Sequence, residues 1–544
     1  MNLSHRFSAF NLFAGGFLTA TVILFLIWGL GFTHYHAPYL FMLSAFFGLF
    51  MAFNIGGNDV ANSFGTSVGA GTLSVPQALA IAAIFEVSGA LIAGGEVTDT
   101  IRKGIVDLEQ LDIQPLQLVY IMMSSLIAAA LWLLFATHKG WPVSTTHSIV
   151  GAIVGAALVM GTVLDQPQPL NMVRWRQIGH IVLSWVISPV LGGLMSYLVF
   201  RLIKEKILLL GEIEHEKYAQ RVNTRRLTHK AGEESPEPEA LPPEPEPAPP
   251  APEAYSLRQN WQLLPTESEP EPAPPPQPWH KKLSKTLGQL GQSMQGVEEQ
   301  KLEEEAYPRV RRVRKVYLPL IAAAGVLIVG YMLIFKGLKN LALDLSSGQY
   351  LTIFAVLGLL SWFITKRFTG RFRSHQLARI TYIFFSWMQV LTASCFAFSH
   401  GSNDIANAIG PFAAILEVLK TESLALAAPI PAYAMLAFGI ALVAGLWFIG
   451  KEVIATVGTH LAAMSPASGF TAELSAAIVV LLASSMGLPV SSTHILVGAV
   501  LGIGLVNRNA NWRLMKPIAL AWIITVPIAC MIAAGTCWLF LHFN

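Results

Sequence analysis

The segment NIGGNDVANSFGTSVGAG, residues 54–71, interrupts an otherwise apolar part of the chain. It directly follows FMLSAFFGLFMAF and places the carboxylate of Asp59 and several amides where an apolar helix would be expected to continue. A carboxylate inside a membrane segment is costly and usually serves a function. The glycines therefore predict a broken helix that presents polar groups to its neighbours.

The composition around this segment is that of a polytopic all-α membrane protein. Of 544 residues, 53% are hydrophobic and 13% charged, whereas soluble domains carry about 25% charged residues. Runs long enough to cross a bilayer predict about 12–13 membrane segments. They lie near residues 12–32, 37–55, 77–95, 117–137, 147–164, 178–200, 317–335, 349–365, 380–399, 431–449, 472–487 and 517–541, and a further apolar run at 494–507 is too short to span alone. The strands of a membrane barrel would be shorter and alternating.

Two motifs occur twice in the chain. GGNDVANSFG (Gly56–Gly65) pairs with GSNDIANAIG (Gly401–Gly410). GWPVSTTHSIVGAIVG (Gly140–Gly155) pairs with GLPVSSTHILVGAVLG (Gly487–Gly502). Because both motifs recur in the same order and at nearly the same separation, we interpret them as an internal duplication.

Basic segments predict the orientation of the two copies. RVRRVRK (Arg309–Lys315) and KRFTGRFRSHQLAR (Lys366–Arg379) are expected in the cytoplasm by the positive-inside rule. The span count then places the N-terminus and central loop in the cytoplasm and the C-terminus outside. The two copies enter the membrane from opposite sides, an arrangement typical of secondary transporters, whose site lies between inverted repeats.

A Pro- and Glu-rich zone separates the two apolar zones. It contains ESPEPEALPPEPEPAPPAPEAY, a composition that cannot bury a core and favours a solvated chain. We divide the chain into an extra N-terminal helix (1–36), a first transmembrane repeat (37–202), a largely disordered cytoplasmic loop (203–315), two connecting transmembrane helices (316–379) and a second inverted transmembrane repeat (380–544).

The paired NDVAN/NDIAN and PVSTTH/PVSSTH motifs resemble the signature repeats of the PiT family of inorganic phosphate transporters. IFEVSGA and TIRKGIVD also resemble that family's first half. The resemblance covers roughly 37–200 and 380–541, and neither the first helix nor the Pro/Glu segment. It implies discontinuous helices, re-entrant hairpins and import of phosphate coupled to a cation gradient.

The resemblance also sets the expected partners. Phosphate, sodium ions and the lipid bilayer are expected, without a cofactor, nucleic acid or enzymatic activity, and a homodimer is left open. The form GGNDVANSFGT favours sodium over protons. Without eukaryotic targeting cues, we expect the inner (cytoplasmic) membrane of a bacterium.

Asp59 and Asp404 are the candidate cation ligands. Amide oxygens beside them would complete an all-oxygen shell of the kind that hard cations prefer, and the resemblance implies sodium. We assign Asn62 and Asn407 to the cation, and Asn58 and Asn403 to the phosphate. No Lys or Arg falls in the middle of a predicted span, so an anion beside two aspartates requires accompanying cations.

Hydroxyl groups at two helix starts are the candidate phosphate ligands. A helix N-terminus attracts anions, and hydroxyls add further donors. The residues are Ser144, Thr145, Thr146, Ser491, Ser492 and Thr493. Simple capping of the helices is the alternative, but the duplication favours a shared ligand. The histidines that follow, His147 and His494, are expected to pack between helices.

Three more residues are candidates for gating or proton handling. Glu86 and Glu473 match acidic positions of the family that the motifs resemble, and His400 precedes the second signature without a counterpart in the first. For Glu473 an interfacial position is the alternative.

Other functions fit less well. An intramembrane hydrolase would not duplicate its nucleophile motif, and no Gly-x-Ser-x-Gly turn is present. A channel would not require paired acids in inverted copies. A proton-coupled carrier of metal-phosphate and a carrier of another oxyanion such as sulfate stay open.

Overall fold

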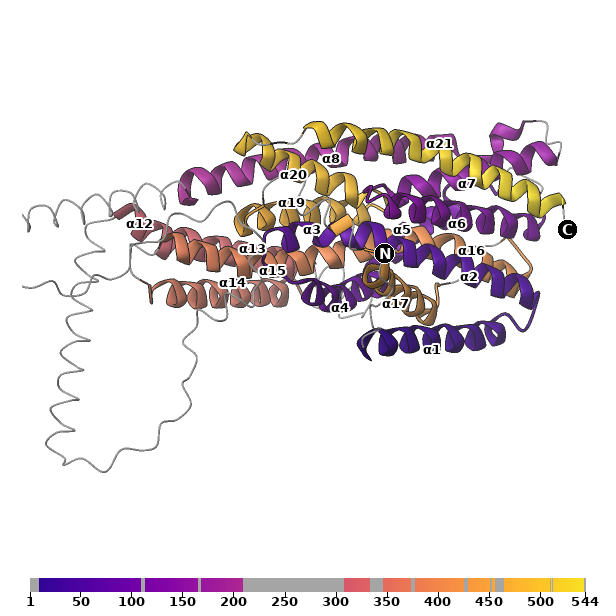
Figure 1. The fold of residues 1–544 in the computed structure, drawn as a ribbon. Coiled ribbons are helices and arrows are strands. Elements are labelled where there is room, and N and C mark those ends of the chain that lie inside the picture. The colour runs from indigo at the N-terminus through magenta and orange to yellow at the C-terminus, as the bar shows by residue number, and fades with distance from the viewer. Residues whose placement is uncertain are drawn as a thin grey trace, which may run out of the picture. The chain divides into compact units, whose positions relative to one another are not determined.

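The computed structural model describes residues 9–108, 113–164, 168–208, 308–332, 346–372, 377–424, 429–450, 453–454, 464–508, 510 and 512–542, without the side chains of residues 9–13, 62, 308, 309, 332, 514 and 517. These ranges are helical apart from loops and one antiparallel bridge between Val106 and Val173 (Figure 1). They contain 12 helices long and apolar enough to cross a membrane. The predicted all-α polytopic class is confirmed. Most of the Pro/Glu loop lies outside the described residues.

The chain forms two compact units. The first comprises Met1–Phe200, Tyr331–Asp344 and Gln389–Asn544, and the second comprises Arg201–Gly330 and Leu345–Met388. The first unit holds α1 (Ala9–Phe32), α2 (Pro38–Ile55), η1 (Gly56–Val60), α3 (Ala61–Gly69), α4 (Val75–Ala93), α5 (Gly95–Lys103), α6 (Pro115–His138), α7 (Thr145–Val163), η2 (Pro169–Met172), α16 (Ala406–Thr421), α17 (Ala432–Ile449), α19 (Pro466–Ser485), α20 (Ser492–Asn507) and α21 (Trp512–His542). Most of α8 (Trp175–Ile203) and the end of α15 (Leu377–Asp404) also belong to it.

The second unit holds the remaining elements. They are η3 (Lys204–Leu208), α12 (Pro308–Arg312), η4 (Val313–Tyr317), α13 (Leu318–Met332) except its last two residues, α14 (Ser347–Thr369), the end of α8 and the start of α15. The buried Arg314 donates from Nε to the Thr369 carbonyl at 3.2 Å, and the Thr369 hydroxyl donates to the Arg314 carbonyl at 3.0 Å. This reciprocal pair ties η4 to the end of α14.

Hydropathy predicted the spans but not the helices that continue past each signature. α3 follows the first signature, α16 follows the second, and α5 is a short helix between α4 and α6. α5 has the polar sequence GEVTDTIRK, so a hydropathy window does not detect it. Its Arg102 is buried, and the guanidinium lies 3.3 Å from the Glu417 carboxylate of α16. An ion pair between helices, and not a lipid-facing surface, therefore supports this element.

Both signatures interrupt a helix only briefly. Gly56–Val60 forms a single π-helical turn between α2 and α3, and Ile405 alone separates α15 from α16. A π-turn widens the helix by one residue and often marks a functional site. Asp59 and Asp404 lie at these two interruptions.

Glycines bring the signature helices against their neighbours. A Cβ added to Gly56 would lie 1.7 Å from the Leu442 carbonyl oxygen on α17. A Cβ added to Gly401 would lie 2.1 Å from the Glu86 carbonyl oxygen on α4. Small residues permit such close helix contacts in membranes. Glycine therefore fixes the distance between each signature and the helix beside it.

The two hydroxyl motifs begin α7 and α20 in the same way. Gly140 and Gly487 both adopt φ of +66°, a conformation that favours glycine, and each precedes a Pro-Val-Ser loop. Farther along, a Cβ on Gly155 would lie 2.2 Å from the Cys530 oxygen, and one on Gly502 would lie 2.3 Å from the Gly193 oxygen. Both glycines therefore let their helix approach a neighbouring helix closely.

Candidate functional site

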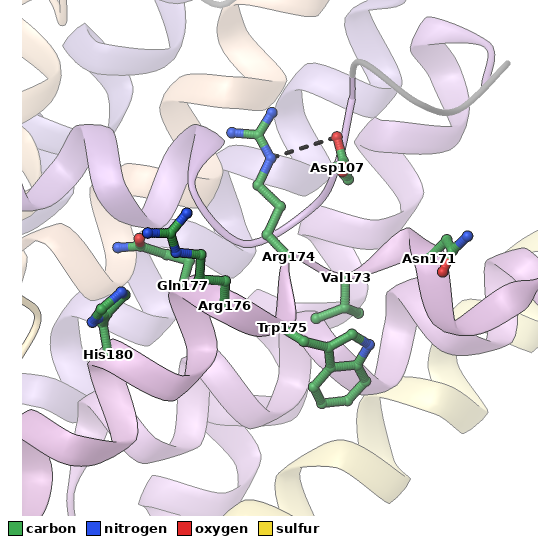
Figure 2. A pocket seen from close by; sticks show the side chains of 8 residues that line it. All are labelled: Asp107, Asn171, Val173, Arg174, Trp175, Arg176, Gln177 and His180. Atoms are coloured by element: carbon green, nitrogen blue, oxygen red, sulfur yellow. Dashed lines mark ion pairs between the residues drawn. The ribbon is translucent and has the colours of Figure 1, made fainter.

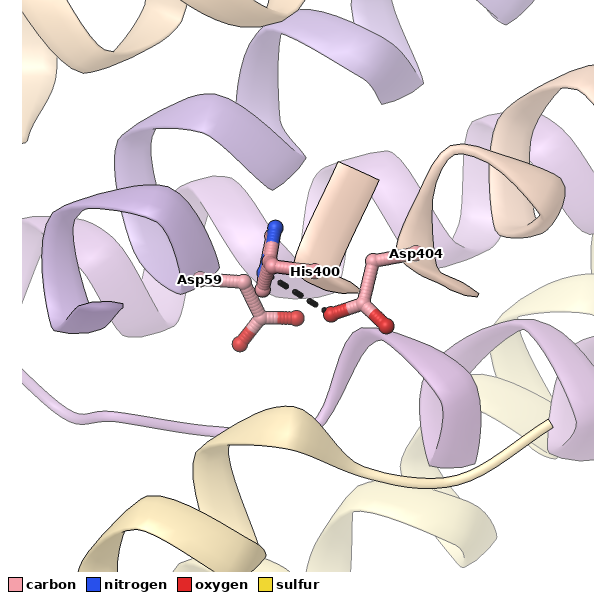
Figure 3. Close-up of side chains that lie close together, drawn as sticks. All are labelled: Asp59, His400 and Asp404. Atoms are coloured by element: carbon pink, nitrogen blue, oxygen red, sulfur yellow. Dashed lines mark ion pairs between the residues drawn. The ribbon is translucent and has the colours of Figure 1, made fainter. Parts of the chain in front are cut away.

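The two signature aspartates meet in the interior of the first unit. Asp59, His400 and Asp404 each offer a ligand atom, and these atoms lie within 4.8 Å of one another (Figure 3). All three side chains are buried, with Asp59 2% and Asp404 0% exposed. Two carboxylates this close repel each other unless a positive charge or protons join them.

Hydroxyls from both helix starts face the aspartates. Asp59 accepts hydrogen bonds from Thr145 at the start of α7 and from Thr493 at the start of α20. Asp404 accepts one from Ser492, also at the start of α20. The structure thus brings together the residues predicted for the cation and several of those predicted for phosphate.

Asn407 joins the same group. Its Nδ2 donates to the hydroxyls of Thr145 and Thr146 at 3.0 and 3.1 Å. Oδ1 of Asn407 and Oδ1 of Asp404 are buried and accept no hydrogen bond from any described residue. Buried acceptors of this kind are rare, and oxygen atoms are the ligands that hard cations prefer.

Asn58 and Asn403 make matching sets of contacts. Asn58 Nδ2 donates to the Thr137 hydroxyl and the Trp141 carbonyl, and its Oδ1 accepts from Val143 N at 3.1 Å. The equivalent partners of Asn403 are the hydroxyl of Ser484, the carbonyl of Leu488 and the amide N–H of Val490. Both side chains therefore hold the loop that precedes a hydroxyl motif.

Ser144 and Ser491 cap the two helices. The Ser144 Oγ accepts from the backbone N–H of His147 at 3.1 Å, and Ser491 Oγ accepts from that of His494 at 3.2 Å. The Thr146 hydroxyl on α7 donates to the Val490 carbonyl, in the loop before α20, at 2.9 Å. Capping, the alternative considered from sequence, is present at both serines.

Comparison with known proteins shows which family contains this chain. The sequence model of the phosphate transporter family matches residues 55–533, which include both aspartates and both hydroxyl motifs. The chain belongs to the phosphate transporter family. It is a multi-pass membrane protein that transports phosphate and is not an enzyme. The family resemblance predicted from the motifs is confirmed.

Individual relatives of this transporter cover nearly the whole chain. A protein named as a phosphate permease in Mycobacterium bovis is 49% identical over 95% of this chain and 90% of its own length. An inorganic phosphate transporter of Arabidopsis thaliana is 34% identical over 91% of this chain and 71% of its own. A solved structure entitled "The sodium-dependent phosphate transporter" is 30% identical, with a TM-score of 0.66 over 93% of this chain and 100% of that one.

His400 connects the transporter's aspartate pair to Glu86. Its Nδ1 lies 2.8 Å from Glu86 Oε2, and its Nε2 lies 2.9 Å from Asp404 Oδ2. The imidazole thus stands between two buried carboxylates, one on α4 and one at the end of α15. The sequence singled out both residues but gave no reason to place them in contact.

Glu473 occupies a second polar cluster in the transporter. Its Oε1 accepts from Thr66 at 2.7 Å, from Ser67, and from Gln389 Nε2 at 3.2 Å, and its Oε2 accepts from Thr392 at 2.9 Å. The carboxylate is fully buried among these donors. Sequence reasoning missed the four donors, although Thr66 and Ser67 lie within the quoted segment.

His147 and His494 pack against each other between the two helix starts. Their ring centroids are 4.4 Å apart, and each ring lies 3.8 Å from an indole, Trp185 for His147 and Trp522 for His494. The two indoles donate across to the carbonyls of Pro489 and Pro142 at 3.1 Å. Packing, as predicted, is what these histidines do.

Proposed function

We propose that this transporter imports inorganic phosphate together with sodium ions and holds the phosphate between two inverted repeats. The observation that carries the proposal is the contact of both aspartates with hydroxyls at the starts of α7 and α20. One group of residues thereby offers oxygen ligands for a cation beside donors for an anion. The sodium-dependent transporter of similar structure adds support for sodium.

The cation is assigned to Asp59, Asp404, Asn407 and Asn62. The unpartnered oxygens of Asp404 and Asn407 support this assignment, because hard cations are held by carboxylate and amide oxygens. A sodium ion here would also reduce the repulsion between the two carboxylates. The assignment of Asn62 rests on its place in the signature alone.

The phosphate is assigned to the hydroxyls of Ser144, Thr145, Thr146, Ser491, Ser492 and Thr493. In the structure three of them donate to aspartates. When a cation binds the carboxylates, those hydroxyl protons can turn toward an anion while the oxygens face the cation. Free backbone N–H groups at a helix start add donors for the same anion. Binding of the cation and of phosphate would therefore support each other.

Asn58 and Asn403 contribute to this site by positioning. Each amide already engages two acceptors and one backbone N–H of the loop before its hydroxyl motif. We therefore revise their predicted role as phosphate ligands. They fix the helix starts so that the serine and threonine hydroxyls converge on the phosphate.

Glu86, His400 and Glu473 are proposed to handle protons or to gate the site. The line of contacts from Glu86 through His400 to Asp404 supports proton coupling as the second candidate. A proton bound along this line would offset the charge of phosphate as a sodium ion does. Glu473, enclosed by donors from α3 and α15, is assigned to gating.

The orientation and the five-part division of the chain stay part of this proposal. The N-terminus and central loop are placed in the cytoplasm and the C-terminus outside, in a bacterial inner membrane. Every proposed ligand comes from one chain, so the site does not need a homodimer.

Uptake of labelled phosphate into proteoliposomes tests the function and its coupling. An imposed sodium gradient without a proton gradient should drive uptake, and excess unlabelled phosphate should compete where sulfate does not. Uptake driven by a proton gradient alone would replace sodium by the second candidate. Transport of sulfate in preference to phosphate would refute the substrate assignment.

A further inference from the structure

A basic cavity lies at the start of α8, away from the residues assigned to transport. It has a volume of about 590 Å³ and is lined by Asp107, Arg174, Trp175, Arg176 and His180, among others (Figure 2). Pockets of about 300–1,000 Å³ accommodate organic ligands of drug size. The space is therefore larger than a single phosphate ion requires.

The back wall of this cavity is well defined. Arg174 N donates to the Ile105 carbonyl at 2.9 Å, and Asp107 N donates to the Met172 carbonyl at 3.0 Å, on either side of the bridge between Val106 and Val173. Arg174 Nε then lies 3.5 Å from Asp107 Oδ1 (Figure 2). Backbone pairing thus fixes one guanidinium and one carboxylate before any ligand binds.

The charges of the cavity fit an anion with a single negative charge. One carboxylate, which pairs with Arg174, and two guanidinium groups line the cavity, and His180 adds a further donor. Arg176 and His180 are exposed. By the proposed orientation this end of α8 lies outside, where Lys and Arg are normally scarce. Two arginines at this position therefore suggest a ligand.

An apolar face of α8 continues directly from the cavity. Arg176 and His180 are followed at helical spacing by Leu183, Ile187 and Val190, which are 56%, 45% and 63% exposed. In a membrane-spanning helix such a face contacts acyl chains. Trp175, 48% exposed beside the cavity, is the residue type that gathers at the membrane–water interface.

We propose that this cavity binds the phosphodiester headgroup of an anionic phospholipid, with an acyl chain of the same molecule along Leu183, Ile187 and Val190. A phosphodiester carries one negative charge and matches the cavity, and a guanidinium binds phosphate oxygens in a bidentate manner. The adjoining apolar face favours a lipid over free phosphate, which could use only the polar part of the site. The site is separate from the proposed transport site and does not depend on it.

Lipid titration of the purified full-length protein in detergent tests this inference. Native mass spectrometry would count bound phosphatidylglycerol and phosphatidylcholine in the wild type and in the double variant Arg176→Gln/His180→Gln. We expect the wild type to prefer phosphatidylglycerol, and the double variant to bind it roughly tenfold more weakly. Both substituted side chains are exposed, so folding should be preserved.

Arg201→Gln is the matched control, because this exposed arginine lies at the other end of the same helix. It should bind phosphatidylglycerol like the wild type. Unchanged phosphatidylglycerol binding in the double variant would overturn the proposal. The lipid that the wild type binds and the double variant loses is the fraction assigned to the cavity. If millimolar inorganic phosphate or glycerol 3-phosphate displaced this fraction, the cavity would be a site for a soluble anion and the proposal would be overturned. Neither result bears on phosphate uptake, which is measured separately.

Discussion

The hydroxyl of Thr493, at the start of α20, donates a hydrogen bond to the carboxylate of Asp59 in the π-turn after α2, 434 residues away in the chain. Asp59 also accepts from Thr145 at the start of α7. One carboxylate is therefore held by hydroxyls from both copies of the duplicated motif. Removing its charge should affect both copies at once.

Asp59→Asn and Asp404→Asn should each remove sodium-dependent phosphate binding while the protein still folds. Asparagine keeps the size of the side chain but supplies no negative charge to hold sodium. Loss of a partner for a buried charge costs about 3 kcal/mol, a factor of roughly 100 in affinity. The measurement is phosphate binding to the purified variants across a range of sodium concentrations.

Asp99→Asn provides the control for these two variants. Asp99 is 44% exposed and pairs with Arg102 and Lys103 at the end of α5. It should keep wild-type sodium dependence. If both buried variants also kept it, the assignment of the cation to Asp59 and Asp404 would be wrong.

Glu86→Gln and His400→Gln should not act independently. Because His400 contacts Glu86 at 2.8 Å, the second substitution should cost less once the first has removed the contact. Groups in direct contact show interaction energies of about 0.5–3 kcal/mol. A double-mutant cycle on the initial rate of phosphate uptake measures this energy.

Glu86→Gln combined with His36→Gln serves as the comparison cycle. His36 pairs with Glu422 before α2 begins and shares no partner with Glu86. This pair should be additive. Additivity in the Glu86 and His400 cycle as well would show that the contact has no role in transport.

Glu473→Ala should destabilise the protein more than Glu473→Gln. Alanine leaves Thr66, Ser67, Thr392 and Gln389 without their acceptor, whereas glutamine keeps one carbonyl oxygen in place. Each buried group left without a partner costs about 1–3 kcal/mol. Thermal unfolding in detergent compares the two variants. Equal midpoints would contradict the hydrogen-bonded arrangement, and Glu422→Ala, at a 76% exposed position, should leave the midpoint unchanged.

Gly56→Ala should lower folded yield and unfolding temperature. The added Cβ would lie 1.7 Å from the Leu442 carbonyl oxygen, so α2 or α17 has to move, and overpacking costs about 1–3 kcal/mol or more. Gly179→Ala on α8 meets nothing within 4 Å and should be neutral or slightly stabilising. Size-exclusion profiles and melting curves distinguish the two. A wild-type profile for Gly56→Ala would show that the helices are not packed this closely.

Deletion of residues 233–280 should leave phosphate affinity nearly unchanged. The segment's Pro/Glu composition cannot form a packed core, and it lies outside both duplicated zones. Replacing it by a flexible linker of Gly and Ser and measuring the concentration dependence of uptake is the test. A large loss of affinity in correctly inserted protein would assign the loop a role in transport.

The sequence by itself determined the class of protein, its spans and the two pairs of motifs. Hydropathy and motif recurrence are properties of the linear chain. An apolar run forms its own helix, because its backbone hydrogen bonds must be made within the segment in the membrane. The choice of Asp59, Asp404 and the six hydroxyls as candidates followed from the duplication. The sequence also predicted that His147 and His494 pack rather than bind.

Only the tertiary structure decided which of these groups touch. Thr493 reaches Asp59, whereas its counterpart Thr146 donates to a carbonyl and not to Asp404. Asn58 and Asn403 accept hydrogen bonds from the loops that precede the two hydroxyl motifs. Such choices depend on how each helix is rotated about its axis and how closely glycines let helices approach, which no local pattern records.

His400 reaches Glu86, and Glu473 reaches Thr66, across separations of 314 and 407 residues. The duplication could not predict the contact of His400 with Glu86. Gly401 packs against Glu86, and in the first copy Gly56 packs in the same way against Leu442. Ile55 stands there in place of His400 and Leu442 in place of Glu86, so the first copy has no equivalent pair.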